Sequence, residues 1–246
     1  MDDYPFNNQC ITLTFSNVVE NNVGMQKIGS MDSHPPFSID QLKNMGGELI
    51  MLALDESLQP KGIKHEPAAV LVIRDFYNQP TLLFNHLLTM AWDKQALMRG
   101  QVKNKRARYN LCFSNNNQEP DYQQGKGRVV NIKEDPLLSD LQHRIGQLTN
   151  LYDLNAEGNY YYDITKTGIG FHGDKERNIV VGLRLGETMP LCFQWYHQSQ
   201  RVGPKMTIDL NHGDLYIMSE KAVGQDWMKR SQLTLRHAAG CHHYTK

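Results

Sequence analysis

The chain has 246 residues, enough for one large domain or two small ones and for a substantial buried core. An apolar fraction of 40% and a charged fraction of 21% are those of a globular protein and argue against wholesale disorder. Lys plus Arg and Asp plus Glu number 26 each, so no global charge draws the chain to nucleic acid or membrane, and any such binding must come from a local patch.

The cysteines and the lengths of the apolar runs bear on where in the cell the protein is located. The four cysteines Cys10, Cys112, Cys192 and Cys241 form no CxxC pair, which argues against a zinc ribbon or a thioredoxin-like motif. Residues 1–10 lack the apolar core of a signal peptide, and no apolar run approaches the roughly 18 residues of a membrane span. We therefore expect reduced thiols in a soluble cytoplasmic or nuclear protein that is neither secreted nor bound to a membrane.

The first third of the chain predicts a small α+β unit. Alternating residues at 10–15 predict a strand, and Ser38 is a candidate N-cap for a helix over 38–44. A second apolar segment follows at 49–54. Residues 55–67 are rich in charge, Pro and Gly and indicate a boundary. We predict an N-terminal α+β extension over 1–60 and a larger domain over 61–246.

The middle of the chain predicts two strands and two helices. A β-branched run at 68–75 and an aromatic segment at 109–113 predict strands, and helical spacing extends over 81–98 and 136–148. Trp92 is expected in the core and Asp135 as a helix cap. A polar loop over 114–127 contains Tyr122.

From residue 155 onward, short strands alternate with turn signals, which is typical of an antiparallel sandwich or barrel. The predicted strands are 160–164, 179–185, 191–196, 206–210, 214–218 and 233–238.

His172 and Asp174 form half of a metal site, because residues two apart on an extended backbone project to the same side. A second His from a distant strand would complete the two-His, one-carboxylate triad that holds Fe(II) and leaves coordination positions open. Five later histidines are candidates: His197, His212, His237, His242 and His243. We favour His237, which lies in a strand-like segment followed by small residues, whereas His212 lies in a turn.

A basic run precedes an aromatic strand. Its cations are Arg99, Lys103, Lys105, Arg106 and Arg108, and Tyr109 follows at once. Cations neutralise phosphates and aromatic faces stack on bases, so the run predicts either a nucleic-acid contact or simply a solvated charged loop.

Four features resemble the double-stranded β-helix core of Fe(II)/2-oxoglutarate oxygenases, most closely the AlkB branch, over residues 155–218 and the tail to 246. The segment 159–161 resembles an NxY motif, and 172–174 matches HxD. The segment 211–215 resembles a strand in which the His is not a ligand, and 230–236 has the spacing of a C-terminal arginine pair. If Arg230 and Arg236 were that pair, the distal His should precede them, where Lys229 stands; we therefore prefer His237 as the ligand.

The resemblance implies an α+β fold with a double-stranded β-helix (jelly-roll) core flanked by helices. It implies Fe(II) held by the catalytic residues His172, Asp174 and His237, with 2-oxoglutarate as co-substrate. Asn159 and Tyr161 would contact 2-oxoglutarate, and its far carboxylate would be anchored by Arg236 or Lys246, with Arg184 a further candidate.

The implied function is that of an oxidoreductase, a dioxygenase that oxidises a C–H bond on a nucleobase of DNA or RNA. Single-stranded nucleic acid or a flipped base is the expected partner. The expected substrate contacts are Lys105, Arg108, Tyr109 and Tyr122, with Trp195 as a further stacking residue. Two alternatives stay open: a protein or small-molecule hydroxylase like the prolyl hydroxylases, which Lys246 favours, and a binding module that keeps the fold without catalysis.

Overall fold

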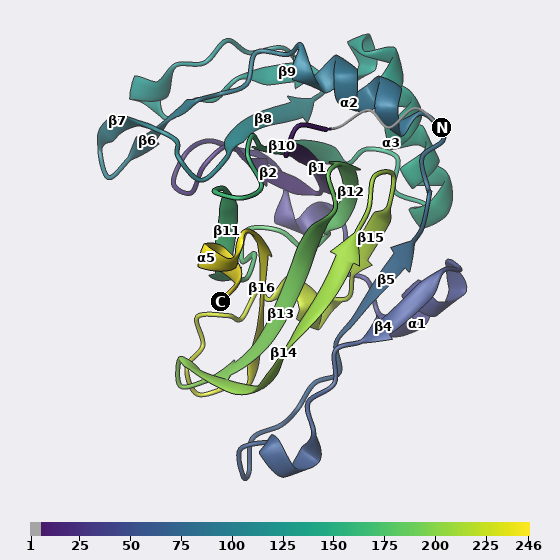
Figure 1. Cartoon of the computed structure of the whole chain (residues 1–246), viewed down its shortest axis with the longest axis vertical. Coiled ribbons are helices and arrows are strands. Elements are labelled where there is room, and N and C mark those ends of the chain that lie inside the picture. The colour runs from purple at the N-terminus through teal and green to yellow at the C-terminus, as the bar shows by residue number, and fades with distance from the viewer. Residues whose placement is uncertain (1–5) are drawn as a thin grey trace.

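A computed structural model describes residues 6–246 of the chain, which form a sheet-rich mixed α+β fold (Figure 1). The larger sheet has eight strands in the order β4-β5-β15-β12-β1-β10-β8-β9, and the smaller has four in the order β11-β16-β13-β14. All pairs within these sheets are antiparallel except the parallel pair β8–β9. The prediction of an α+β protein with large antiparallel sheets is confirmed.

The strands of the larger sheet are β1 (Cys10–Ser16), β4 (Glu48–Met51), β5 (Ala69–Ile73), β8 (Tyr109–Ser114), β9 (Val129–Asn131), β10 (Asn155–Tyr161), β12 (Val181–Gly186) and β15 (Leu215–Met218). Those of the smaller sheet are β11 (Gly168–His172), β13 (Met189–His197), β14 (Gln200–Leu210) and β16 (Thr234–Gly240). Two hairpins pair β2 (Val18–Glu20) with β3 (Lys27–Gly29) and β6 (Gln95–Met98) with β7 (Gln101–Asn104). The helices are α1 (Ile39–Asn44), α2 (Pro80–Leu88), α3 (Pro136–Thr149), α4 (Glu220–Val223) and α5 (His242–Thr245).

Strand β1 lies in the middle of the larger sheet, between β10 and β12. Its alternation separates two faces: Ile11, Leu13 and Phe15 enter the hydrophobic core, whereas Thr12 and Thr14 face a cavity. The division of the chain near residue 60 stays a prediction, but the strand that begins the expected N-terminal extension is an integral part of this sheet.

Helices α2 and α3 pack on the core face of the larger sheet. Leu83 and Leu87 of α2 and Leu141 of α3 join the cluster that contains the apolar side chains of β1. As predicted, the carboxylate of Asp135 caps α3 and accepts hydrogen bonds from the backbone N–H groups of Leu137 and Leu138. This face is therefore closed by helices, and any cavity must lie on the opposite face of the sheet.

The chain crosses repeatedly between the two sheets after residue 155. Strands β10, β12 and β15 belong to the larger sheet, and β11, β13, β14 and β16 to the smaller. Apolar side chains of both sheets, including Phe193, Trp195, Leu235 and Met218, form one buried cluster between them. The predicted sandwich of antiparallel strands is thus present with shifted boundaries, but β11 was not among the predicted strands and β14 begins at Gln200 rather than at residue 206.

One predicted helix is wrong in its second half. The spacing over residues 81–98 predicted a single helix, but α2 ends at Leu88, where Thr89 forms the C-cap and donates from its hydroxyl to the carbonyl of His86. Asp93 then bridges to Asn110, and residues 95–98 turn back as strand β6. The apolar spacing of Ala96 and Leu97 therefore came from a hairpin. Trp92 is buried, as predicted.

Within residues 6–246, none of the helices has the length and apolar character that crossing a bilayer requires.

Candidate metal centre

His172 and His237 lie directly opposite each other on neighbouring antiparallel strands. His172 ends β11, His237 lies in β16, and the two are register partners. Side chains at such paired positions have Cβ atoms roughly 5 Å apart, and the two ring centroids are separated by 4.5 Å. Strand pairing thus places together two imidazoles that are far apart in the sequence.

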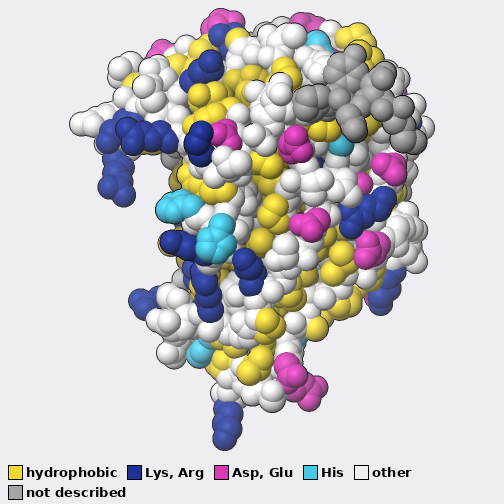
Figure 2. All heavy atoms as spheres, in the orientation of Figure 1, with side chains coloured by type: hydrophobic (Ala, Val, Ile, Leu, Met, Phe, Trp, Pro, Cys, Tyr) yellow, Lys and Arg dark blue, Asp and Glu magenta, His cyan; other side chains and the backbone are white. Residues whose placement is uncertain are grey.

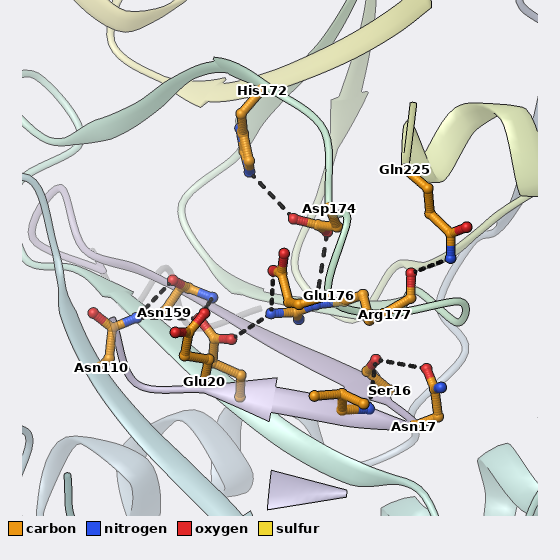
Figure 3. Close-up of polar contacts among 12 residues, drawn as sticks. Ser16, Asn17, Glu20, Asn110, Asn159, His172, Asp174, Glu176, Arg177 and Gln225 are labelled. Carbon is orange, nitrogen blue, oxygen red and sulfur yellow. Dashed lines mark hydrogen bonds and ion pairs between the residues drawn. The ribbon is translucent and has the colours of Figure 1, made fainter. Parts of the chain in front are cut away.

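Asp174 completes the cluster two residues after His172. Its backbone N–H donates to the carbonyl of Val223, which fixes the turn. A Cβ at Gly173 would lie 2.1 Å from the carbonyl oxygen of Gly224, so only glycine fits between the two candidate ligands. The Asp174 carboxylate lies 3.6 Å from Nε2 of His172 (Figure 3). It also lies 3.7 Å from Nε2 of His237.

One nitrogen or oxygen from each of His172, Asp174 and His237 lies within 4.8 Å of the others. Nδ1 of His172 is 2.8 Å from the carbonyl oxygen of Gly170, so it donates a proton there and leaves the Nε2 lone pair facing the carboxylate. A donor set of two imidazoles and one carboxylate fits the facial triad of non-haem Fe(II) centres.

The protonation of these groups suits a metal ligand set. Burial and, to a smaller extent, the nearby His172 lower the pKa of His237 to about 4, so His237 is neutral at physiological pH. Burial alone would raise the pKa of Asp174, but Arg177 and the two histidines outweigh it and hold the pKa below its ordinary value. Neutral imidazoles and an ionised carboxylate are the forms that bind metal ions.

The three residues line a cavity between the two sheets. One end, here called the floor, is formed by Thr12, Thr14, Arg184, Tyr161 and Tyr216, all of them buried. The other end, here called the mouth, includes the exposed Val23 and is formed by Glu20, Asn21, Asn22, Val23, Arg108, Glu157, Asn159, Glu176 and Arg177. The remaining lining residues are mostly apolar and come from β11, β13, β15 and β16.

Charges at the mouth are paired with one another. Arg177, whose side chain is almost fully buried, donates to Glu157 at 2.9 Å and to Glu176 at 3.3 Å. Nε of Arg108 donates to Oδ1 of Asn159 at 2.5 Å. Figure 3 shows this network beside Asp174, with Arg177 reaching from the carboxylate towards the side chains of β10. The mouth is thus a rigid polar frame around the cluster.

The floor contains a buried cation without a carboxylate partner. Arg184 of β12 is 1% exposed, and among residues 6–246 it makes no salt bridge. Its guanidinium donates to the thiol of Cys10 at 3.4 Å, and its Nε has no hydrogen-bond partner. The register partner of Arg184 on β1 is Thr12, whose hydroxyl also lacks a partner.

The sequence-predicted contacts to 2-oxoglutarate divide into two groups. Asn159 and Tyr161 line the cavity, as the resemblance implied. Arg236 does not, because it is adjacent to His237 in β16 and therefore faces away; its guanidinium packs on the rings of Tyr196 and Trp227. Lys246 is exposed at the chain end and is also absent from the cavity wall. Of the three residues considered for the far carboxylate, only Arg184 lines the cavity.

The predicted substrate contacts are likewise divided. Arg108 lines the mouth. Lys105 is buried and donates to the backbone carbonyl and side chain of Asn21 and to Asn110, so its ammonium cannot contact an external ligand. The hydroxyl of Tyr122 donates to Asp93, which ties the 114–127 loop to the chain before β6.

Two aromatic residues expected to stack on bases have partners within the protein. Tyr109 stacks on Tyr162 with ring centroids 4.6 Å apart, although its side chain is only half-buried. Trp195 is fully buried and donates from its indole to the carbonyl of Leu52, so it is a core residue and its expected stacking role is wrong.

The β6–β7 hairpin carries two cations of the basic run, Arg99 and Lys103, and Arg106 follows it. All three are exposed, and Lys94 lies over the ring of Tyr109. Figure 2 shows Lys and Arg side chains gathered at the upper left, where Figure 1 places this hairpin, above a hollow in that face. The basic run is thus an exposed projection, apart from Lys105 and the partly buried Arg108.

Several cavity residues were not identified from the sequence: Thr12, Thr14, Glu20, Asn21, Glu157, Glu176 and Arg177. Two of them could have been found from the sequence: Thr12 and Thr14 alternate with the apolar residues of a predicted strand, and this alternation indicates that they lie on its polar face. For the others, no local pattern shows which strands will be neighbours.

The two facing sheets and the histidine-carboxylate cluster between them define a sheet-rich α+β protein with a candidate metal centre. No family model matches the chain. The chain is 48% identical over 251 residues to a protein of Acanthamoeba polyphaga mimivirus named "Uncharacterized protein R156", covering 97% of this chain and 98% of the viral protein. The chain belongs to the same family as this viral protein.

Proposed function

We propose that the protein is an Fe(II)- and 2-oxoglutarate-dependent dioxygenase that oxidises a C–H bond. The observation that carries this proposal is the convergence of His172, Asp174 and His237 within 4.8 Å in the wall of a cavity. An Fe(II) ion bound there would supply the O2-dependent oxidation. The protein's own part is to present two imidazoles and one carboxylate in fixed positions and to surround them with a largely buried cavity.

The finer fold assignment belongs to the same proposal. A jelly roll has eight strands in two antiparallel sheets. The four strands of the smaller sheet and β15, β12, β1 and β10 of the larger make such a set. Seven of these come from residues 155–240, and β1 takes the eighth place. The strand that the resemblance requires after β16 would then be replaced by one from the N-terminal part of the chain.

A nucleobase is the substrate that we favour. Two exposed cationic residues flank the half-buried pair Tyr109 and Tyr162: Lys94 lies over the Tyr109 ring, and the Tyr162 hydroxyl donates to the carbonyl of Arg106. This combination suits a single-stranded nucleic acid. Amide groups at the mouth, such as Asn21 and Asn159, offer the donors and acceptors that read the edge of an extruded base.

A protein or small-molecule hydroxylase is the second candidate. Glu20, Glu157 and Glu176 surround the mouth, and carboxylates repel phosphate, so this observation favours a neutral or cationic substrate. A binding module without catalysis is the third candidate, and it predicts metal binding with no consumption of 2-oxoglutarate.

The test begins with metal binding. Anaerobic titration with Fe(II) should show one tight site per chain. His172→Ala should weaken Fe(II) binding by more than about 100-fold, because losing a metal ligand reduces affinity more than losing a residue that hydrogen-bonds to a ligand. His243→Ala is the control, since His243 is exposed and lies outside the cavity. Equal affinity in His172→Ala and the unmodified chain would disprove the metal centre.

Turnover then separates the candidates. Consumption of 2-oxoglutarate should rise when methylated single-stranded oligonucleotides are added, and Arg99→Ala combined with Lys103→Ala should weaken oligonucleotide binding and its salt dependence. Stimulation by peptides or small molecules but not by oligonucleotides would support the second candidate.

A further inference from the structure

The floor of the cavity contains a buried cation that has no carboxylate partner in the part of the chain that the structure describes. Arg184 is 1% exposed, yet the groups that interact with it electrostatically are the thiol of Cys10 and the hydroxyls of Tyr161 and Tyr216, not a carboxylate. An unpaired buried cation costs a protein several kcal/mol at least, by general estimates. Such an arrangement favours the binding of an anion that can pair with the guanidinium.

Unpartnered hydrogen-bond donors at the floor point to the same conclusion. Nε of Arg184 and the hydroxyl of Thr12 have no partner, although Thr12 is 4% exposed. The two residues are register partners on β12 and β1, so their side chains stand side by side on the cavity face. A planar carboxylate that accepts from both would satisfy these groups and neutralise the guanidinium.

The room for this ligand is built into neighbouring residues. A Cβ at Gly182 would lie 2.2 Å from ring atoms of Tyr216, so only glycine allows this ring to pack against β12 here. Gly182 lies two residues before Arg184, on the same face of the strand. Tyr216 and Tyr161 then complete the floor beside Arg184. Their hydroxyls are further donors for a carboxylate.

We infer that Arg184 and Thr12 bind the far carboxylate of an organic dicarboxylate whose other end reaches the metal centre. This deepens the proposed function and rests on it for the identity of the ligand as 2-oxoglutarate, but the anion site itself is argued from the floor alone. It assigns to β12 and the N-terminal strand a contact that the sequence resemblance had assigned to Arg236 or Lys246.

Glutarate is the first probe, because it has both carboxylates of 2-oxoglutarate but lacks the 2-oxo group that would chelate a metal. Binding is measured by calorimetry and by thermal shift on the full chain in the presence of a chelator. We expect glutarate to bind and raise the melting temperature, and Arg184→Met to weaken its binding by at least about 10-fold. Thr12→Val should weaken it by a smaller factor, and Arg184→Lys should retain part of it.

Arg236→Met is the matched control, because it also removes a strand arginine but one that lies outside the cavity; glutarate affinity should not change. Arg184→Met without ligand should be as stable as the unmodified chain or more stable, since it removes an unpaired buried charge. That result would show that weakened binding does not come from misfolding.

The outcomes separate the two proposals. Unchanged glutarate affinity in Arg184→Met would overturn the anion site, whatever the metal titration shows. Loss of glutarate binding in Arg184→Met, together with no Fe(II) binding by the unmodified chain, would sustain the anion site and remove the oxygenase. Equal binding of sulfate and glutarate, with both lost in Arg184→Met, would restrict the inference to a general anion and overturn the dicarboxylate assignment.

Discussion

The two ends of the cavity each contain a buried arginine, but they differ in how the charge is balanced. Arg177 at the mouth is 6% exposed and has carboxylates on three sides, from Glu157, Glu176 and Asp174. Arg184 at the floor is 1% exposed and has none within the described residues. The pairing of Arg177 indicates a structural role, whereas the unpaired Arg184 indicates a place for a ligand.

We therefore expect Arg177 to contribute mainly to the stability of the fold and Arg184 mainly to ligand binding. Asp174 and Glu157 both raise the pKa of Arg177, because the ion pairs favour its charged form. Substitutions at the mouth should therefore change folding more than affinity for a dicarboxylate, and those at the floor should do the reverse.

The largest expected effect is at the mouth. Arg177→Met leaves Glu157 buried without its cation, and the free energy of unfolding should fall by about 3–5 kcal/mol. Urea denaturation of the metal-free protein measures this. Adding Glu157→Gln to Arg177→Met should recover part of the loss, because it removes the stranded charge. A stability loss from Arg184→Met as large as that from Arg177→Met would erase the proposed contrast between the arginines.

A smaller effect is expected where the floor is packed. Gly182→Ala places a methyl group against the ring of Tyr216, which must move towards the cavity. Overpacking of this kind costs about 1–3 kcal/mol, and the displaced ring should also weaken glutarate binding. Calorimetry and thermal unfolding check both effects. Tyr216→Phe in the Gly182→Ala background is not expected to restore stability, because the clash involves the ring itself; restoration would point to the hydroxyl instead.

The smallest effect concerns Glu20. Burial and the nearby Glu176 and Glu157 raise its pKa, and they outweigh the hydrogen bond from the backbone N–H of Gly24, which lowers it. Because the folded pKa lies above the unfolded value, the chain loses stability as pH rises from the ordinary carboxyl pKa through the raised one. Glu20→Gln should therefore raise the melting temperature at neutral pH by about 1–3 °C and have little effect near pH 4. A larger benefit at pH 4 than at pH 7 would contradict this sign.

Local signals in the sequence predicted much of the framework. Ser38 caps α1 in a complete capping box and Asp135 caps α3, as expected. The spacing of His172 and Asp174 placed both on one side of the chain, and the strand-like context of His237 led to the third member of the cluster. These inferences depend on neighbours within a few residues, which a sequence displays directly.

Long-range neighbours could not be read in the same way. Nothing near residue 12 indicates that Thr12 will lie beside Asn159 on one side and Arg184 on the other. The choice of Arg236 failed for a reason that strand alternation could have shown, since a residue adjacent to an inward His faces outward. The helix over 81–98 failed because a hairpin mimicked helical spacing.

The central position of β1 also constrains how the chain folds. This strand spans Cys10–Ser16, yet both of its neighbours lie much later in the sequence, since β10 begins at Asn155 and β12 at Val181. Contacts so distant in sequence form slowly, and until they form the apolar residues of β1 and its unpaired backbone groups remain open to association with other chains. The middle of the larger sheet forms only after β10 and β12 have been made, so chains truncated before these strands should aggregate rather than fold.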